Sequence, residues 1–121
     1  RGGTETILLA EDEHEVRAAL KGILEEFGYT IIEAEDGRDA VQKFMMNFDR
    51  VQLLVFDVMM PVRNGVEAFE EIKKMAPDMR AVFTSGYTAK VAVEGRGLLH
   101  FIPKPVQPDI LLEKIREVLD A

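Results

Sequence analysis

The sequence contains no cysteine, and none of its apolar runs is long. Without cysteine the chain cannot form disulfides, use a thiol nucleophile or bind zinc through thiolates. No apolar run approaches the roughly 20 residues that a membrane-spanning helix needs, and the N-terminal stretch RGGTET does not resemble a signal peptide. These absences fit a protein of the reducing cytoplasm, and we expect no membrane contact by this domain.

Basic residues are in the minority, with 15 Lys and Arg against 22 Asp and Glu and a formal charge of −7. Nucleic acids bind to clustered Lys and Arg, so we expect no direct nucleic-acid partner. The chain is rich in apolar residues, since 47% of its 121 residues are hydrophobic. That content is sufficient for the core of one compact domain.

The N-terminal residues read as the tail of a flexible linker, because RGGT is small and polar. We therefore predict a linker tail over residues 1–5 and a single domain over residues 6–121. The sequence begins at Arg1 and not at methionine, which predicts that the domain is part of a longer protein or has been processed.

Short apolar runs alternate with amphipathic stretches along the whole domain. The runs predict strands at 6–10, 29–34, 51–57, 80–85 and 98–102, and the amphipathic stretches predict helices at 13–27, 36–48, 65–75, 86–97 and 107–119. Five β–α units imply an α/β fold with a doubly wound parallel sheet. The helical periodicity places Met45, Phe48 and Ile110 on inward faces, and Gly28 is placed to end the first helix.

Polar side chains gather where four of these strands end. They are Glu11–Asp12 after the first strand, Asp57 after the third, Thr84–Ser85 after the fourth and Lys104 after the fifth. The carboxyl ends of parallel strands form the ligand-binding edge of such a sheet. Alone, Asp57 could cap a helix and Lys104 could be an ordinary surface lysine, but their joint position favours a site.

Three carboxylates at one edge repel one another unless a cation joins them. Oxygen ligands without histidine or cysteine favour a hard ion, and magnesium before calcium. Asp12 and Asp57 can supply two oxygens, and a main-chain carbonyl just after Asp57 can supply a third. We therefore predict a Mg²⁺ site whose remaining positions stay open to an incoming phosphoryl group.

These residues resemble a known family. The acidic pair Glu11–Asp12, the stretch DVMMP with Gly65 beyond it, the stretch TSGY, and Lys104–Pro105 together resemble the receiver domain of two-component response regulators. The stretches GTETILLAEDE and FTSGY resemble receivers at the C-terminal end of hybrid sensor histidine kinases. The resemblance implies a flavodoxin-like five-stranded sheet of order 2-1-3-4-5 with five helices.

The resemblance also implies residue roles. Asp57 would be the phosphoacceptor, taking a phosphoryl group from the phosphohistidine of a histidine kinase or a histidine phosphotransfer domain. Asp12, Asp57 and the main-chain carbonyl of Met59 would bind Mg²⁺, and Glu11 would act mostly through a metal-bound water. The domain would thus assist its own phosphorylation and dephosphorylation.

The remaining roles concern the fourth and fifth strands. Ser85 would hydrogen-bond the phosphoryl group, although Thr84 is an alternative, and Lys104 would pair with it. Ser85 and Phe101 would form the switch, with Phe101 signalling by burial because it has no hydroxyl group. Family members also suggest a cis Lys104–Pro105 bond.

Three other readings remain open at this point. A degenerate receiver would act only as a protein-interaction module. A haloacid-dehalogenase-like phosphatase would need a second aspartate where Met59 stands, and a flavodoxin-like cofactor binder would need a loop rich in Ser, Thr and Gly where AEDEHE stands. The sequence also leaves open which kinase is the cognate one and whether phosphorylation drives homodimerisation. The full-length protein is either a hybrid kinase or a separate regulator.

Met59 and Tyr87 would flank the phosphoryl group, and their lack of an acid or amide predicts a long-lived acyl phosphate.

Overall fold

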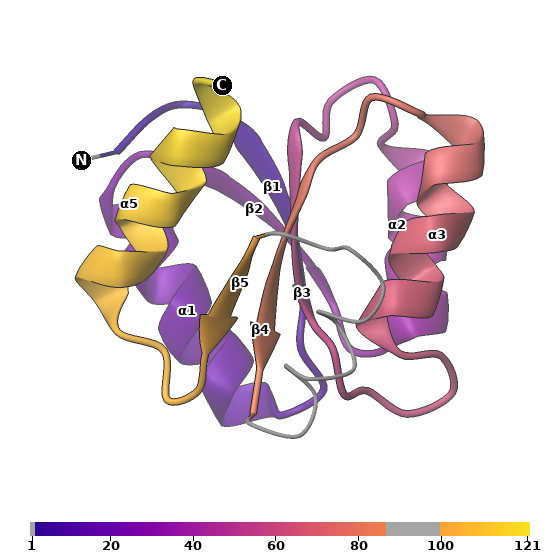
Figure 1. The fold of residues 1–121 in the computed structure, drawn as a ribbon, viewed down its shortest axis with the longest axis horizontal. Coiled ribbons are helices and arrows are strands. Elements are labelled where there is room, and N and C mark those ends of the chain that lie inside the picture. The colour runs from indigo at the N-terminus through magenta and orange to yellow at the C-terminus, as the bar shows by residue number, and fades with distance from the viewer. Residues whose placement is uncertain (1, 87–99) are drawn as a thin grey trace.

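The computed structural model of the chain describes residues 2–86 and 100–121. Its centre is a sheet of five parallel strands in the order β2-β1-β3-β4-β5, which confirms the predicted topology (Figure 1). The strands are β1 Thr6–Ala10, β2 Thr30–Ala34, β3 Leu53–Asp57, β4 Ala81–Ser85 and β5 Phe101–Pro103. Residues 98 and 99 of the predicted fifth strand lie outside the described residues.

Helices cover both faces of this sheet. Among the described residues there are four of them: α1 His14–Glu26, α2 Gly37–Met46, α3 Gly65–Met75 and α5 Pro108–Leu119. Helices α1 and α5 lie on one face and α2 and α3 on the other (Figure 1). The predicted helix over 86–97 lies, except for Gly86, outside the part of the chain that is described. No helix in the described ranges is both long and apolar enough to cross a membrane.

The central strand β3 is buried on both faces, which explains its uninterrupted apolar run. Leu54 and Phe56 pack into the cluster beneath α2 and α3, whereas Leu53 and Val55 pack into the cluster beneath α1 and α5. Alternation along the strand thus divides the core into two layers. Asp57 ends this buried strand, so its carboxylate is presented from a rigid base.

The helix ends follow local sequence signals. Gly28 has φ of 101° and follows the last turn of α1, so the predicted glycine at this helix end is confirmed. Asn64 and Glu67 form a capping box at the start of α3: each side chain accepts a hydrogen bond from the other residue's main-chain N–H. This cap sets where α3 begins, directly beyond the loop that follows Asp57.

Several residues that the helical periodicity places on inward faces are exposed instead, among them Ala19 and Phe27 of the first predicted helix. Met45 and Phe48 are exposed because α2 buries Ala40, Val41 and Phe44 and already ends at Met46. Phe48 therefore lies beyond the helix whose periodicity predicted it. In α5, Ile110 is exposed and the inward face includes Leu112 in its place.

Residues of the predicted linker tail contact the domain. The main-chain N–H of Gly3 donates to the carbonyl of Phe27 at 3.1 Å. Glu5 receives two hydrogen bonds from the Arg116 guanidinium, at 2.9 and 3.1 Å. The N-terminal segment is thus held against α1 and α5, while the domain boundary at residue 5 stays a prediction.

We expect Glu5→Gln to destabilise the protein by roughly 0.5–1 kcal/mol at pH 7. The hydrogen bond from Arg116 holds the pKa of Glu5 below its usual value of 4.5. The ion pair therefore stabilises the fold above that value, and its contribution is lost as the pH falls through the lowered pKa. Urea denaturation at several pH values measures the difference. Glu26→Gln, an exposed glutamate at the end of α1, is the matched control, and an equal loss in both variants would contradict the pairing.

Candidate functional site

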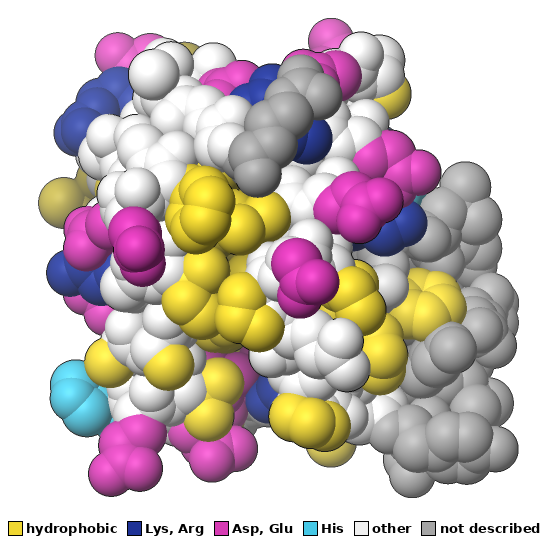
Figure 2. Space-filling model, turned by 90° about the vertical axis from the view of Figure 1, so that its left-hand side faces the viewer, with side chains coloured by type: hydrophobic (Ala, Val, Ile, Leu, Met, Phe, Trp, Pro, Cys, Tyr) yellow, Lys and Arg dark blue, Asp and Glu magenta, His cyan; other side chains and the backbone are white. Residues whose placement is uncertain are grey.

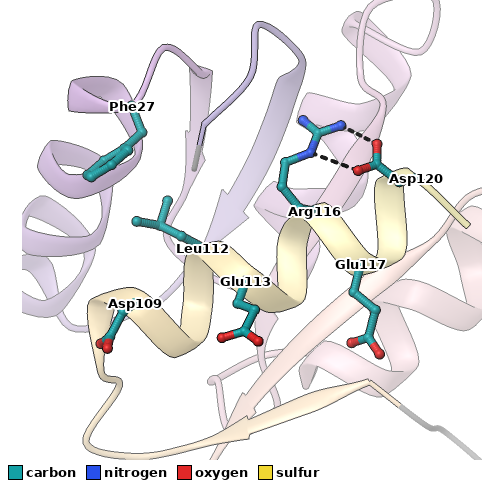
Figure 3. Close-up of a pocket in the computed structure, with 7 residues that line it drawn as sticks. All are labelled: Phe27, Asp109, Leu112, Glu113, Arg116, Glu117 and Asp120. Atoms are coloured by element: carbon teal, nitrogen blue, oxygen red, sulfur yellow. Dashed lines mark hydrogen bonds and ion pairs between the residues drawn. The ribbon is translucent and has the colours of Figure 1, made fainter.

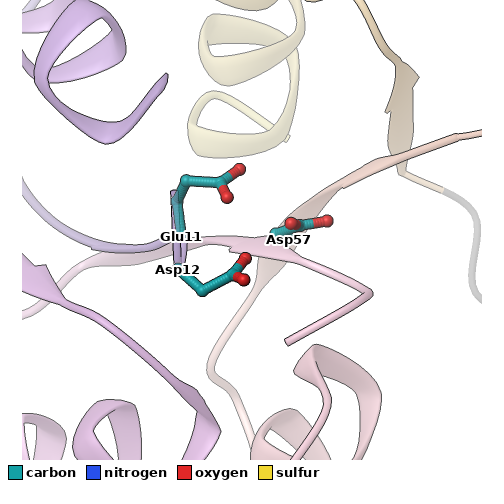
Figure 4. A group of neighbouring side chains, drawn as sticks. All are labelled: Glu11, Asp12 and Asp57. Atoms are coloured by element: carbon teal, nitrogen blue, oxygen red, sulfur yellow. The ribbon is translucent and has the colours of Figure 1, made fainter. Parts of the chain in front are cut away.

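Three carboxylates from two strands meet at the carboxyl edge of the sheet. Glu11 and Asp12 follow β1, and Asp57 is the last residue of β3. One carboxylate oxygen of each lies within 4.8 Å of those of the other two, and Figure 4 shows the side chains of Glu11 and Asp12 directed to the side where Asp57 lies. Glu11 and Asp57 are only 1% and 3% exposed, whereas Asp12 is exposed. The cluster therefore has a buried base and an open front.

Lys104, which follows the edge strand β5, contacts the two buried acids. The Lys104 ammonium lies 3.0 Å from Glu11 Oε1 and 2.9 Å from Asp57 Oδ2. Burial alone would lower the pKa of Lys104, but its hydrogen bonds to Asp57 and Glu11 outweigh that effect and raise it. Burial raises the pKa of Glu11. One cation thus faces two carboxylates, and the site retains an excess of negative charge.

Main-chain hydrogen bonds hold Lys104 at this position. Its N–H donates to the carbonyl of Ser85 at 2.9 Å, and Pro103 pairs with Ser85 in the strand register. The Lys104–Pro105 bond is cis, as family members suggested. The lysine is thereby fixed to the end of β4, beside the strand that carries Asp57.

The two candidate hydroxyl residues differ in their surroundings. Thr84 pairs with Asp57 in the strand register. Ser85 is fully buried, and its Oγ has no hydrogen-bond partner among the described residues. A buried hydroxyl without a partner costs free energy, so Ser85 is the residue that an added acceptor would satisfy. Phe101 pairs with Phe83, and strand alternation puts both on the face of Ser85.

The loop after Asp57 is drawn close to its carboxylate. The N–H of Met59 donates to Asp57 Oδ1 at 3.2 Å, and the N–H of Gly65 donates to the carbonyl of Val58 at 2.9 Å. A side chain at Gly65 would overlap the main-chain carbonyl of Asp57. Glycine is therefore required where α3 begins, because the helix start touches the strand end that carries the acid.

Arg17 is a site neighbour that the sequence analysis did not single out. From the first turns of α1, its Nη1 donates to the main-chain carbonyl of Glu11 at 2.7 Å. Its Nε also pairs with Glu33 at 3.2 Å. The only sequence signal is a basic residue soon after the acidic pair, and basic residues on exposed helix turns are common.

A groove in the surface lies away from the cluster of Glu11, Asp12 and Asp57. This groove of about 500 Å³ is lined by Phe27, Leu112 and Arg116 together with three acids of α5, Asp109, Glu113 and Glu117, and with Asp120 at the C-cap of that helix (Figure 3). Figure 2 shows hydrophobic side chains gathered on this face, with Asp and Glu side chains around them. Its acidic rim disfavours phosphate, and Phe27 lies at the opposite end of α1 from Glu11 and Asp12.

The fold and site together define a doubly wound α/β domain with a carboxylate–lysine site at the carboxyl edge of its sheet. A family model described as the response regulator receiver domain matches residues 7–116. The chain belongs to the response regulator receiver domain family. This result confirms the resemblance identified from the sequence.

Relatives of the chain include a long sensor kinase and a chemotaxis protein of nearly the same length as the chain. The sensor kinase CckA of Brucella abortus is 32% identical over 121 residues, covering 98% of this chain but only 13% of the kinase. The chemotaxis protein CheY of Thermotoga maritima is 33% identical over 117 residues, covering 93% of this chain and 95% of that protein. The crystal structure of the receiver domain of hybrid histidine kinase CckA superposes with a TM-score of 0.81 at 30% identity, covering 94% and 98% of the two chains.

We expect Lys104→Met to destabilise the metal-free protein by roughly 2 kcal/mol, since it leaves two buried carboxylates without their cation. The cost is below that of a fully buried pair because the lysine side chain is 27% exposed. Urea denaturation in EDTA measures the loss in free energy of unfolding. Added Mg²⁺ should reduce the difference in this free energy between the variant and the unsubstituted protein. Lys114→Met removes the partner of the exposed Glu117 and should cost much less, because water screens an exposed ion pair. Equal losses in the two variants would count against a structural role for Lys104.

Proposed function

We propose that Asp57 accepts a phosphoryl group from the phosphohistidine of a histidine kinase or a histidine phosphotransfer domain. The observation that carries this proposal is the buried Asp57 carboxylate, which contacts Lys104 and lies within a cluster of three acids. An ionised carboxylate oxygen attacks phosphorus, the phosphorus–nitrogen bond of the donor breaks, and an acyl phosphate forms. This chemistry depends mainly on positioning and on electrostatic stabilisation.

The acid cluster fits Mg²⁺ as the ion of this reaction. Its donors are all oxygens, and the exposed Asp12 beside the buried Asp57 leaves room for water ligands. Asp12, Asp57 and the main-chain carbonyl of Met59 would hold the ion, with Glu11 acting through a bound water. The bound ion supplies neutralisation of the charge on the transferring phosphoryl oxygens.

The protein groups around Asp57 have separate tasks in this proposal. Lys104 pairs with a phosphoryl oxygen in exchange for part of its contact with Asp57. Ser85 donates its unpartnered hydroxyl to another phosphoryl oxygen, which favours it over Thr84. Phe101 shares the sheet face of Ser85, so a shift of Ser85 can change the burial of Phe101.

The relatives suggest the partners of this domain. CckA is a sensor kinase, and we propose a histidine kinase or phosphotransfer domain as the phosphodonor here. The chain covers a small part of that kinase but nearly all of a CheY protein, so both a hybrid kinase and a separate regulator remain candidates for the parent. The cytoplasmic location, the lack of direct nucleic-acid binding and phosphorylation-dependent homodimerisation stay predictions.

We expect the unsubstituted protein, called the parent in the experiments below, to gain one phosphoryl group on incubation with Mg²⁺ and acetyl phosphate. The Asp57→Asn variant should gain none. The amide keeps the size of the side chain but is not a nucleophile. Intact-protein mass spectrometry measures the added mass. Asp109→Asn, which removes an acid that lines the groove of Phe27 and Leu112, should label like the parent.

The same experiment separates the competing functions. An interaction module would remain unlabelled, and a phosphatase would release phosphate continuously without retaining the label. Labelling of Asp57→Asn to the level of the parent would contradict the assignment of the phosphoacceptor. Labelling that is unchanged in EDTA would contradict the dependence on Mg²⁺.

We also expect the acyl phosphate to be long-lived. Met59 is exposed beside Asp57, and its side chain has no acid or amide group to orient an attacking water. The other flanking residue in this hypothesis, Tyr87, lies outside the described residues. Met59→Asn should accelerate loss of phosphate by about tenfold or more, as followed by the decay of labelled protein after removal of the donor.

Met59→Ala is the control for this prediction, because it shortens the side chain without adding a polar group. Its decay rate should match that of the parent. Acceleration in Met59→Ala, or decay of the parent within seconds, would show that the methionine does not set the lifetime.

A further inference from the structure

Arg17 connects the acidic pair to the edge strand β2. Its guanidinium makes three contacts: Nη1 with the main-chain carbonyl of Glu11 at 2.7 Å, Nε with Glu33 Oε1 at 3.2 Å, and Nη2 with His14 Nδ1 at 3.3 Å. Its side chain is only 13% exposed. The guanidinium is planar, and its fork of donors can satisfy separate acceptors at fixed angles.

The Glu11 carbonyl is a sensitive point in the site. The N–H of Glu11 still belongs to the sheet, because it donates to the carbonyl of Ala34 at 3.1 Å. The next peptide unit carries the Glu11 carbonyl at one end and the N–H of Asp12 at the other. A donor that holds this carbonyl therefore fixes the orientation of the peptide from which the Asp12 side chain departs.

The Glu11 side chain is also tied to this turn. Its Oε2 accepts a hydrogen bond from the N–H of Glu13 at 3.0 Å, and its Oε1 accepts one from Lys104 at 3.0 Å. Rotation of the peptide after Glu11 would disturb both contacts. The turn from Glu11 to Glu13 and the acidic cluster thus form one unit, and Arg17 holds it from outside.

A simpler explanation is that Arg17 only neutralises Glu33. Lys21 provides a comparison, because its Nζ pairs with the second oxygen of Glu33 at 3.1 Å, while within the described part of the chain it forms no hydrogen bond or ion pair with Glu11. The hydrogen bond from Lys21 is the main cause that lowers the pKa of Glu33, ahead of the one from Arg17. Glu33 thus keeps a cationic partner without Arg17, and the Glu11 carbonyl is the acceptor that distinguishes the two cations.

We propose that Arg17 is a positioning residue that orients the turn after β1, and with it Glu11 and Asp12, for binding of the divalent cation. This inference rests on the proposed function, since it assigns Mg²⁺ to the acidic cluster. Arg17 acts through the main chain and contacts neither the phosphoryl group nor the ion.

The test compares Arg17→Ala with Lys21→Ala, which removes the other cation from Glu33 and serves as the matched control. Mg²⁺ affinity is measured by titration of amide chemical shifts. We expect Arg17→Ala to weaken Mg²⁺ binding by roughly tenfold or more, as is typical when a partner of a metal ligand is lost, and Lys21→Ala to change it by less than about twofold. Loss of equal size in both variants would overturn the proposal, because Arg17 would then act only through Glu33.

A second readout needs no metal. In EDTA, exchange of the Glu13 amide hydrogen reports its bond to the Glu11 carboxylate. We expect faster exchange in Arg17→Ala and parent-like exchange in Lys21→Ala. Unchanged affinity and unchanged exchange in Arg17→Ala would also overturn the proposal. If Arg17→Ala does not fold, Arg17→Lys is measured in its place, because it keeps the charge but not the fork of donors. We then expect a smaller loss of Mg²⁺ affinity and a smaller increase in Glu13 exchange.

Failure of this inference is distinguishable from failure of the proposed function. Labelling of the parent at Asp57 decides the function. The metal-free exchange of Glu13 decides the role of Arg17 without any phosphoryl transfer. A parent that cannot be labelled, together with faster exchange in Arg17→Ala, would reject the function and leave the positioning role supported.

Discussion

The contact of Lys104 with two buried carboxylates is the constraint on which this site depends. Glu11 and Asp57 are nearly inaccessible to water, and a buried carboxylate is stable only when it is paired and hydrogen-bonded. Lys104 supplies one charge for both. The remaining negative charge is a physical reason for the site to bind a divalent cation. An incoming phosphoryl group would then be close to two positive charges, the cation and the Lys104 ammonium.

The parallel sheet makes this contact possible. Glu11 and Lys104 follow β1 and β5, and Asp57 is the last residue of β3. These strands are separated by long stretches of sequence but end at the same edge. Main-chain bonds then refine the arrangement: Lys104 is held by Ser85, and Met59 by the Asp57 carboxylate. Rigid strands carry the charges, and the short connections after the strands adjust their distances.

In the proposed function, burial would couple phosphorylation at this edge to the aromatic side chain of Phe101. Ser85 is fully buried and its hydroxyl lacks a partner among the described residues, so a new acceptor near it has a large energetic effect. Phe101 lies on the same sheet face, partly buried against the cluster that contains Phe83. A packed interior has few intermediate arrangements, which favours a discrete response of the aromatic side chain.

Much of this structure was predictable from local patterns. Apolar runs and helical periodicity determined the strands, their parallel arrangement and the edge at which Glu11, Asp12, Asp57 and Lys104 meet, because these patterns reflect burial of each element by itself. Tertiary structure alone decided the exposure of Phe48, since α2 ends before it, and of Ile110, since the rotation of α5 depends on the layer beneath it. The contact of Arg17 with the Glu11 carbonyl was likewise invisible in the sequence. A hydrogen bond to the main chain leaves no mark on the residue type of its acceptor, so only the folded chain could show it.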